Sequence, residues 1–200
     1  MESNQAAPRR GQNANTEDDN LVDHVSQDMA GHIEGQVFVA SETRVAALTA
    51  QFDEANHQLT SIISQCRADE WQSVTQAEGW SVAVTAHHVA IVQRDPFADI
   101  VNALAAGEGY TPNISMEEVS RLNAVHARKF AGVGKDETLE KLDAGRLKIA
   151  GVMRSMDDAL LDQPGGVCGG NELTVEQVLQ FVIIGHVQVH LDSIRDTLSG

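Results

Sequence analysis

One stretch near the end of the chain, residues 175–198, constrains the fold more than any other part of the sequence. Every fourth residue from position 178 onward is apolar except for two histidines: Val178, Val182, His186, His190, Ile194 and Leu198. Residues four apart are neighbours on one face of a helix, so both imidazoles share a face with apolar side chains. The spacing predicts an amphipathic helix whose two histidines, His186 and His190, point toward one object.

Length and charge limit the classes of partner. The chain has 200 residues, which suits one domain with or without a tail, and a formal net charge of -15 at pH 7. This acidic excess argues against nucleic acid and anionic membranes as partners. No stretch approaches the ~18 uninterrupted apolar residues of a membrane span, and the N-terminus has no apolar signal core. We therefore expect a cytoplasmic protein whose partner is a small molecule.

The first part of the chain differs from the rest in composition. Residues 1–35 are rich in Asn, Gln, Asp and Glu and contain one short mixed run, residues 21–33. Such a composition predicts a disordered acidic N-terminal extension, although a short docking helix over about residues 20–32 stays open. The domain itself is predicted to cover residues 36–200.

Helical periodicity dominates the domain. Four long segments carry it: about 41–67, 81–106, 137–162 and 175–198. Ser81 is a good N-cap residue, Pro96 predicts a kink, and a full capping box beginning at Ser115 predicts a short helix in the long connection. No period-2 strand pattern is found, and the glycine-rich stretch 164–170 is interpreted as a turn. The predicted fold class is all-α: a four-helix bundle with a long crossover connection carrying a short extra helix.

A third histidine is expected to join the pair at the end of the chain. His87 and His88 are adjacent, so we expect only one of them to point inward; His88 is the candidate because its neighbours at helical spacing are apolar. Three imidazoles would leave a coordination position open, as in catalytic zinc sites. The alternative is that His186 and His190 are ordinary helix residues that hydrogen-bond to core carbonyls.

Two segments resemble the signatures of DinB-like proteins. The first reads Gly-Trp-Ser-Val-Ala-Val-Thr-Ala-His-His-Val over residues 79–89, and the second reads His-Val-Gln-Val-His-Leu-Asp-Ser-Ile-Arg over residues 186–195. The resemblance covers about residues 40–198. It implies a DinB-like bundle with a divalent metal ion on His88, His186 and His190. Zinc or nickel is favoured as the ion, with iron or manganese as alternatives.

The resemblance implies less about the reaction. Some DinB-like relatives are transferases or isomerases that use a low-molecular-weight thiol, such as mycothiol or bacillithiol; others are known only as stress-associated proteins. A metal ion with an open position lowers the pKa of a bound thiol, or equally of water. We expect a metal-dependent transferase that acts on small molecules with a thiol cosubstrate. The alternatives are a metal-binding stress-response module without turnover and a metal-free structural bundle.

Two further expectations concern assembly and domain content. Symmetric dimers are the commonest assembly for such domains, so a homodimer is predicted. Relatives that resemble the mycothiol-dependent maleylpyruvate isomerases usually carry a second C-terminal domain. This sequence ends at Gly200, which argues against that specific isomerase reaction.

Three residues are candidates for a supporting role around the metal. Asp95 falls near the face of His88, where it would orient an imidazole or remain a surface carboxylate. His126 lies on the inner stripe of the predicted crossover helix, where it would touch the site or pack in the core. Arg195 would bind an anionic thiol cosubstrate or close the end of the bundle through an ion pair.

Overall fold

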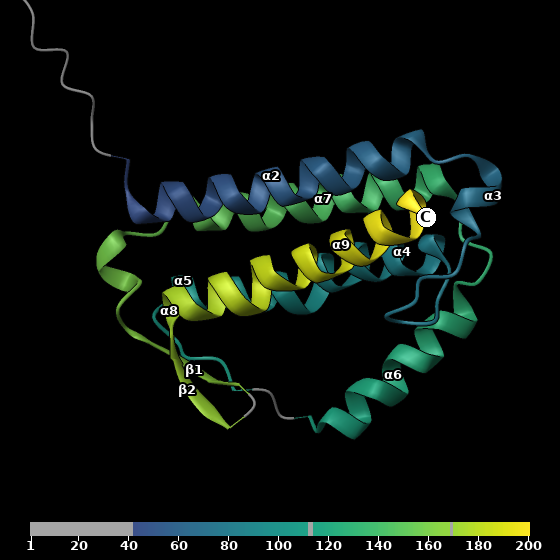
Figure 1. Cartoon of the computed structure of the whole chain (residues 1–200). Helices are drawn as coiled ribbons and strands as arrows, with labels where there is room; N and C mark the ends of the chain where they lie inside the picture. The colour runs from purple at the N-terminus through teal and green to yellow at the C-terminus, as the bar shows by residue number, and fades with distance from the viewer. Residues whose placement is uncertain (1–41, 112–113, 169) are drawn as a thin grey trace, which may run out of the picture. The chain divides into compact units, whose positions relative to one another are not determined.

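The computed structural model describes residues 42–111, 114–168 and 170–200 (Figure 1). The predictions for residues 1–35, including the helix over about residues 20–32, lie outside this part of the chain. None of the helices within the described ranges combines the length and the apolar character that crossing a bilayer requires.

The described residues fold into an all-α bundle of four long helical rods (Figure 1). Helix α2 packs against α7 and α9, and α4 packs against the same two helices. The bounds of the rods are α2 Arg44–Gln65; α4 Val82–Val92 with the π-helical segment η1 Gln93–Phe97 and α5 Ala98–Ala105; α7 Lys135–Met153; and α8 Val175–Gln177 with the π-helical segment η3 Val178–Ile184 and α9 Gly185–Ser199. The prediction of a four-helix bundle is confirmed.

Local sequence explains how the first rod begins and ends. The side chain of Thr43 accepts the backbone N–H of Ala46 at 3.1 Å, which caps the first turn of α2. At the other end, Lys135 Nζ donates to the backbone carbonyl of Cys66 at 2.8 Å. Between these caps the helix buries apolar side chains, each contributing about 1.5–3 kcal/mol to stability. The fully buried members of this face are Phe52, Leu59 and Ile63.

The third rod is shorter than predicted. Helix α7 ends at Met153, and a short 3-10 helix, η2 Asp158–Leu160, follows where the predicted helix would have continued to residue 162. The carboxylate of Asp158 accepts the backbone N–H groups of Arg44 and Val45, both at 2.9 Å. The chain therefore leaves the helix and uses this acidic residue to cap α2.

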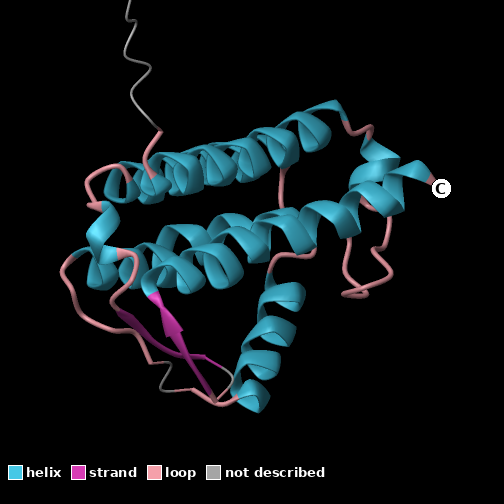
Figure 2. Cartoon of the chain, turned by 60° about the vertical axis from the view of Figure 1, so that its left-hand side comes forward, coloured by secondary structure: helices cyan, strands magenta, loops and turns pink. Residues whose placement is uncertain are grey.

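The crossover connection carries the predicted short helix, α6 Met116–Lys129, whose C-terminal end lies nearest to the bundle (Figures 1 and 2). The Ser115 hydroxyl accepts the backbone N–H of Glu118 at 3.2 Å, but the Glu118 carboxylate bonds to Arg121. The prediction of a full capping box was therefore wrong, since only half of it forms. None of the residues of α6 is buried; Leu122, which shares the predicted inner stripe with His126, is 45% exposed.

A β-hairpin replaces the predicted turn at residues 164–170 (Figure 2). Strand β1, Pro164–Cys168, pairs antiparallel with β2, Asn171–Thr174. Tyr110 also donates to the carbonyl of Gly165 at 2.9 Å. A Cβ on Gly166, whose φ is +123°, would lie 1.6 Å from the Tyr110 carbonyl oxygen. The backbone of Tyr110 packs directly against the glycines of this hairpin. Because glycine has no side chain, the strand shows no alternation of apolar and polar residues that could predict it.

The kink expected at Pro96 takes a specific form. The proline lies inside η1, where the helix changes to π-type hydrogen bonding for five residues. A proline cannot donate a backbone hydrogen bond, and in this helix the interruption coincides with a π segment. The second π segment, η3, contains no proline and was not predicted.

Candidate metal centre

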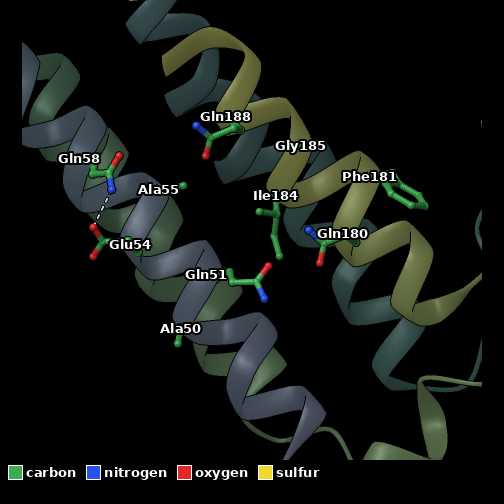
Figure 3. A pocket seen from close by; sticks show the side chains of 10 residues that line it. All are labelled: Ala50, Gln51, Glu54, Ala55, Gln58, Gln180, Phe181, Ile184, Gly185 and Gln188. Carbon is green, nitrogen blue, oxygen red and sulfur yellow. Dashed lines mark hydrogen bonds between the residues drawn. The ribbon is translucent and has the colours of Figure 1, made fainter. Parts of the chain in front are cut away.

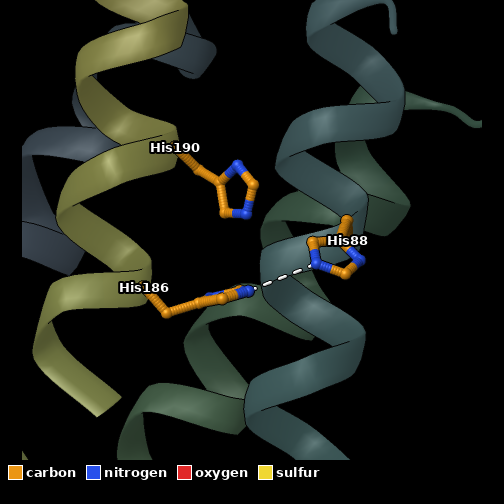
Figure 4. Close-up of side chains that lie close together, drawn as sticks. All are labelled: His88, His186 and His190. Carbon is orange, nitrogen blue, oxygen red and sulfur yellow. Dashed lines mark hydrogen bonds between the residues drawn. The ribbon is translucent and has the colours of Figure 1, made fainter. Parts of the chain in front are cut away.

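Three histidines from two helices converge in the bundle. His186 and His190 lie one turn apart on α9, and His88 of α4 faces them (Figure 4). The Nε2 atoms of His88 and His186 are 3.2 Å apart. One ring nitrogen from each of the three residues can be chosen so that all lie within 4.8 Å of one another. His88 is only 6% exposed, and the other two are partly buried.

This donor set fits a small divalent ion. Zinc binds histidine nitrogens at 2.0–2.1 Å in tetrahedral geometry, which separates neighbouring nitrogens by about 3.3 Å. The distance between the Nε2 atoms of His88 and His186 agrees with that value. The Nδ1 atom of His186 is buried without a hydrogen-bond partner, and its Nε2 atom meets the ring nitrogen of another imidazole, His88. A metal ion between the two Nε2 atoms would bind both lone pairs at once.

Burial favours the neutral form of two of the three imidazoles, His88 and His186. Burial, followed by the neighbouring His190, lowers the pKa of His88 to about 3. Burial and the same neighbour lower the pKa of His186 well below its usual range. A neutral imidazole offers a nitrogen lone pair, and this is the form that binds a metal ion. The centre is therefore ready to accept a cation at neutral pH.

His190 is held by the carboxylate of Glu78, a residue that the sequence did not identify as part of the site. Glu78 Oε1 lies 2.8 Å from His190 Nδ1, and the Ser193 hydroxyl donates to Glu78 Oε2 at 2.6 Å. Burial acts to raise the pKa of Glu78, but hydrogen bonds from Ser193, Thr75 and His190 bring it below its usual value. Its position immediately before Gly79 and Trp80 is the only signal in the sequence.

Glu78 and Trp80 lie on a loop, residues 75–80, that is held by hydrogen bonds within its own backbone. The backbone N–H of Thr75 donates to the Trp80 carbonyl at 2.7 Å, and Gly79 N–H donates to the Thr75 carbonyl at 3.0 Å. Gly79 adopts a φ of +71°, which favours glycine. The Trp80 ring then packs edge-on against His88, with ring centroids 5.4 Å apart.

Both adjacent histidines of α4 are buried, so the expectation that only one points inward was wrong. His88 faces the centre, whereas His87 is fully buried on another side of the helix, against α6. The His87 ring lies 4.2 Å from Phe130 and 5.2 Å from His126, between centroids. Helix α6 covers a face of α4 that helix geometry alone would leave to solvent.

The sequence of the chain matches one protein family. Residues 51–194 match the family model described as the DinB superfamily. The chain belongs to the DinB superfamily. The predicted family is thus confirmed over most of the domain, and a search of curated proteins finds no match.

Two solved structures resemble this DinB-superfamily chain. The crystal structure of a mutant of the mycothiol-dependent maleylpyruvate isomerase matches with a TM-score of 0.55 at 11% identity, covering 75% of this chain and 60% of that one. The colibactin self-resistance protein ClbS, in complex with double-stranded DNA, matches with a TM-score of 0.56 at 12% identity, covering 80% of this chain and 97% of that one. The present chain thus spans 60% of the isomerase chain. These likenesses show a shared fold.

The structure places the three predicted supporting residues differently from one another. His126 lies beside the centre: its ring is 5.4 Å from that of His88, and its Nε2 is 3.4 Å from His87 Nδ1. Asp95 is instead an exposed residue of η1 that forms an ion pair with Arg94. Its predicted contact with an imidazole is made by Glu78. Asp95 follows Arg94 directly, and the π-helical turn shifts it out of the helical phase that the prediction assumed.

Arg195 connects two helices of this DinB-superfamily bundle. Its guanidinium donates to Asp192 at 2.7 Å and to Gln58 of α2 at 2.9 Å. These bonds correspond to the structural alternative considered for Arg195, an ion pair that closes the bundle. The guanidinium of Arg195 therefore bonds to protein groups on the side of α9 that faces α2.

A groove of about 570 Å³ lies between α2 and the last rod, at η3 and the start of α9 (Figure 3). Four glutamines line it together with Phe181, which is 65% exposed. A second groove, of about 620 Å³, lies beside Ser193 and the end of the chain. None of the three histidines lines either groove. The metal centre is therefore a packed cluster of side chains rather than the floor of either groove.

Proposed function

We propose that this DinB-superfamily protein binds one divalent metal ion through His88, His186 and His190 and uses the ion in small-molecule chemistry. The observation that carries this proposal is the convergence of three imidazoles, with two Nε2 atoms 3.2 Å apart. Burying several imidazoles without partners is costly, and a shared cation removes that cost. Zinc and nickel suit an all-nitrogen set best, with iron and manganese as alternatives.

The three histidines would hold the ion, and the aromatic residues beside them would keep water away from it. Phe97 is 8% exposed, and its ring lies 4.9 Å from that of His186, edge to face. Trp80 covers His88 in a similar way. When bound, a divalent ion with an open coordination position lowers the pKa of a thiol or a water molecule placed there. The aromatic side chains reduce the local dielectric and so strengthen that effect.

For the reaction, we propose a transferase that uses a low-molecular-weight thiol as cosubstrate. The support is the DinB-superfamily membership together with the fold likeness to a mycothiol-dependent isomerase. The three-histidine set also leaves an open position of the kind that catalytic zinc sites have. A cytoplasmic location and a homodimer belong to the same proposal; light scattering in solution checks the dimer.

A second candidate is a metal-binding module without turnover, for example one that acts in a stress response. One observation favours it: neither of the two grooves described above reaches the three histidines. A substrate that reaches the ion would therefore have to approach it outside these two grooves. The two candidates share the metal site and differ in whether bound metal supports a reaction.

Elemental analysis of the purified protein tests the metal site. We expect one divalent ion per wild-type chain and less than a tenth of that occupancy in His88→Ala and in His190→Ala. The matched control is His57→Ala, because His57 is an exposed histidine of α2. Full metal content in both ligand variants would refute the site.

A thiol assay separates the two candidates. Metal-loaded and metal-stripped protein are incubated with mycothiol or bacillithiol and a panel of small electrophiles, and thiol consumption is followed. Consumption that disappears in His186→Ala and in the stripped protein supports the transferase. Metal-loaded wild-type protein without turnover of any thiol supports the binding module.

A further inference from the structure

We propose that Glu78 is a positioning residue of the metal centre: it holds His190 as the Nδ1–H tautomer, so that the Nε2 lone pair faces His88 and His186. The inference rests on the proposed metal function. It assigns a role to a loop carboxylate that is 112 residues away from its histidine in the sequence.

The contact between Glu78 and His190 determines which ring nitrogen of His190 carries the proton. An ionised carboxylate can only accept, so the His190 Nδ1 atom at 2.8 Å must carry the proton. A neutral imidazole has one ring proton, which leaves Nε2 with a free lone pair. The Glu78 and His190 side chains are only 10% and 12% exposed, so water competes little for this bond. The contact therefore decides which nitrogen is available to an ion.

Glu78 is itself held on more than one side. Ser193, one turn beyond His190 on α9, donates to its second carboxylate oxygen at 2.6 Å. The backbone of the loop is fixed by the bonds between Thr75 and Trp80 and between Gly79 and Thr75. One carboxylate thus grips two successive turns of α9 from the loop that leads directly into α4. It couples the helix of His190 to the helix of His88.

The three imidazoles are not equally constrained. His186 Nδ1 is buried with no partner, and its Nε2 meets only the ring nitrogen of His88, so no carboxylate fixes its tautomer. His190, in contrast, is oriented by a carboxylate before any ion arrives. Carboxylates in this position fix the orientation of ligand imidazoles and raise their basicity, and losing one costs roughly 10–100-fold in metal affinity. We infer that Glu78 makes His190 the preorganised ligand of the set.

The first test is the tautomer of His190 in metal-free protein. Long-range ¹⁵N–¹H NMR spectra of histidine-labelled wild-type protein are expected to show protonated Nδ1 and bare Nε2 for His190. In Glu78→Gln the side-chain amide can donate as well as accept, so we expect a mixture of tautomers. An Nε2–H tautomer for His190 in the wild type would overturn the inference, whether or not the protein binds metal.

The second test is affinity for zinc, measured by competition with a chromophoric chelator. We expect Glu78→Gln to bind Zn²⁺ roughly 10–100-fold more weakly than the wild type. The melting temperature of the metal-free variant checks that it is folded. The matched control is Asp192→Asn, because the Asp192 carboxylate on the same helix bonds to Arg195 and Gln188 instead. It should bind zinc as the wild type does.

The outcomes separate this inference from the proposed function. Wild-type protein that binds zinc together with Glu78→Gln of unchanged affinity would overturn the role of Glu78 alone. Wild-type protein that binds no divalent ion would overturn the proposed function and, with it, the role of Glu78 as a positioning residue. Weakened binding that Asp192→Asn shares equally would show a general effect of lost charge, and would also count against the inference.

Discussion

Buried histidines give the metal-free protein a pH-dependent stability. The pKa of His88 is lowered to about 3, that of His87 to about 4, and that of His186 well below 6.5, in each case chiefly by burial. In the unfolded chain these groups titrate near 6.5. Between these values the unfolded state binds more protons than the folded state. Above pH 6.5 the three histidines are neutral in both states, and as the pH falls below 6.5 their protonation in the unfolded chain lowers the free energy of unfolding.

We accordingly expect the free energy of unfolding of chelator-treated protein to fall by roughly 2 to 4 kcal/mol per pH unit between pH 6 and 5, because each histidine contributes up to about 1.4. Urea denaturation at pH 7, 6 and 5 measures it. His57→Gln, which alters an exposed histidine, should follow the same curve as the wild type. A free energy that stays constant from pH 7 to 5 would contradict the expectation.

At the level of residues, helical spacing predicts which side chains share a face and little about loops. The spacing of His186 and His190, and the apolar neighbours of His88, were enough to predict that these three side chains converge. Glu78 could not be predicted, because a loop carboxylate that meets a helix 112 residues later leaves no periodic trace. His87 was misplaced because its burial depends on α6, a helix from a distant part of the sequence.

At the level of elements, α7 approaches the π segment η1 closely at Gly145. A Cβ on Gly145 would lie 3.0 Å from Gln93 Cβ and 3.3 Å from the backbone nitrogen of Arg94. Gln93 has little freedom to move, because it is fully buried and donates to Asn56 at 2.7 Å. The same helix contains Gly151, where an added Cβ meets nothing within 4 Å. The two positions form a natural pair for comparison.

We expect Gly145→Ala to lower the free energy of unfolding by about 1–3 kcal/mol, because the added methyl group overpacks a contact between helices. Gly151→Ala should raise it by about 0.5–1 kcal/mol, because alanine favours the helix interior. Urea denaturation of both variants gives the comparison. If the two changed stability in the same direction by the same amount, the close approach of α7 to η1 would be refuted.

The elements were predicted unevenly, for physical reasons. The four rods follow apolar periodicity, and their existence was predictable because burial of one face decides the structure. The hairpin was not, since Gly165 and Gly166 pair through the backbone with Tyr110 and leave no alternating pattern. The end of α7 was set by a tertiary contact, the capping of α2 by Asp158, which outweighs local propensity.

At the scale of the whole molecule, charge is expected to decide the choice of partner. ClbS, which has a similar fold, was crystallised with double-stranded DNA. The present chain carries a net charge of -15, and most of the basic side chains in its described part are paired with carboxylates. Binding to a duplex depends on neutralising phosphates with unpaired Lys and Arg.

We therefore expect no binding to double-stranded DNA tighter than about 100 µM at physiological salt, the weak end of non-specific affinity. Fluorescence anisotropy with a labelled duplex of about two helical turns measures it, with metal-loaded and metal-free protein compared. Micromolar affinity that weakens steeply as salt is added would contradict this prediction and would favour a nucleic-acid partner.

The two π segments bear on how the bundle responds to a change in chain length. A π-type turn holds one residue more than the α-turn it replaces, so η1 and η3 each amount to a single-residue insertion in a rod that carries a metal-ligand candidate. In a plain α-helix an every-fourth series drifts sideways by about 40° per step. The wider turn of η3 offsets that drift between Val178 and His186. Deleting the exposed Phe181 would convert η3 to an α-helix and leave the hairpin in nearly the same orientation relative to His186 and His190, because the π-type turn already absorbs the extra residue. Alignments with other DinB-superfamily chains should therefore allow a one-residue gap at η1 and at η3.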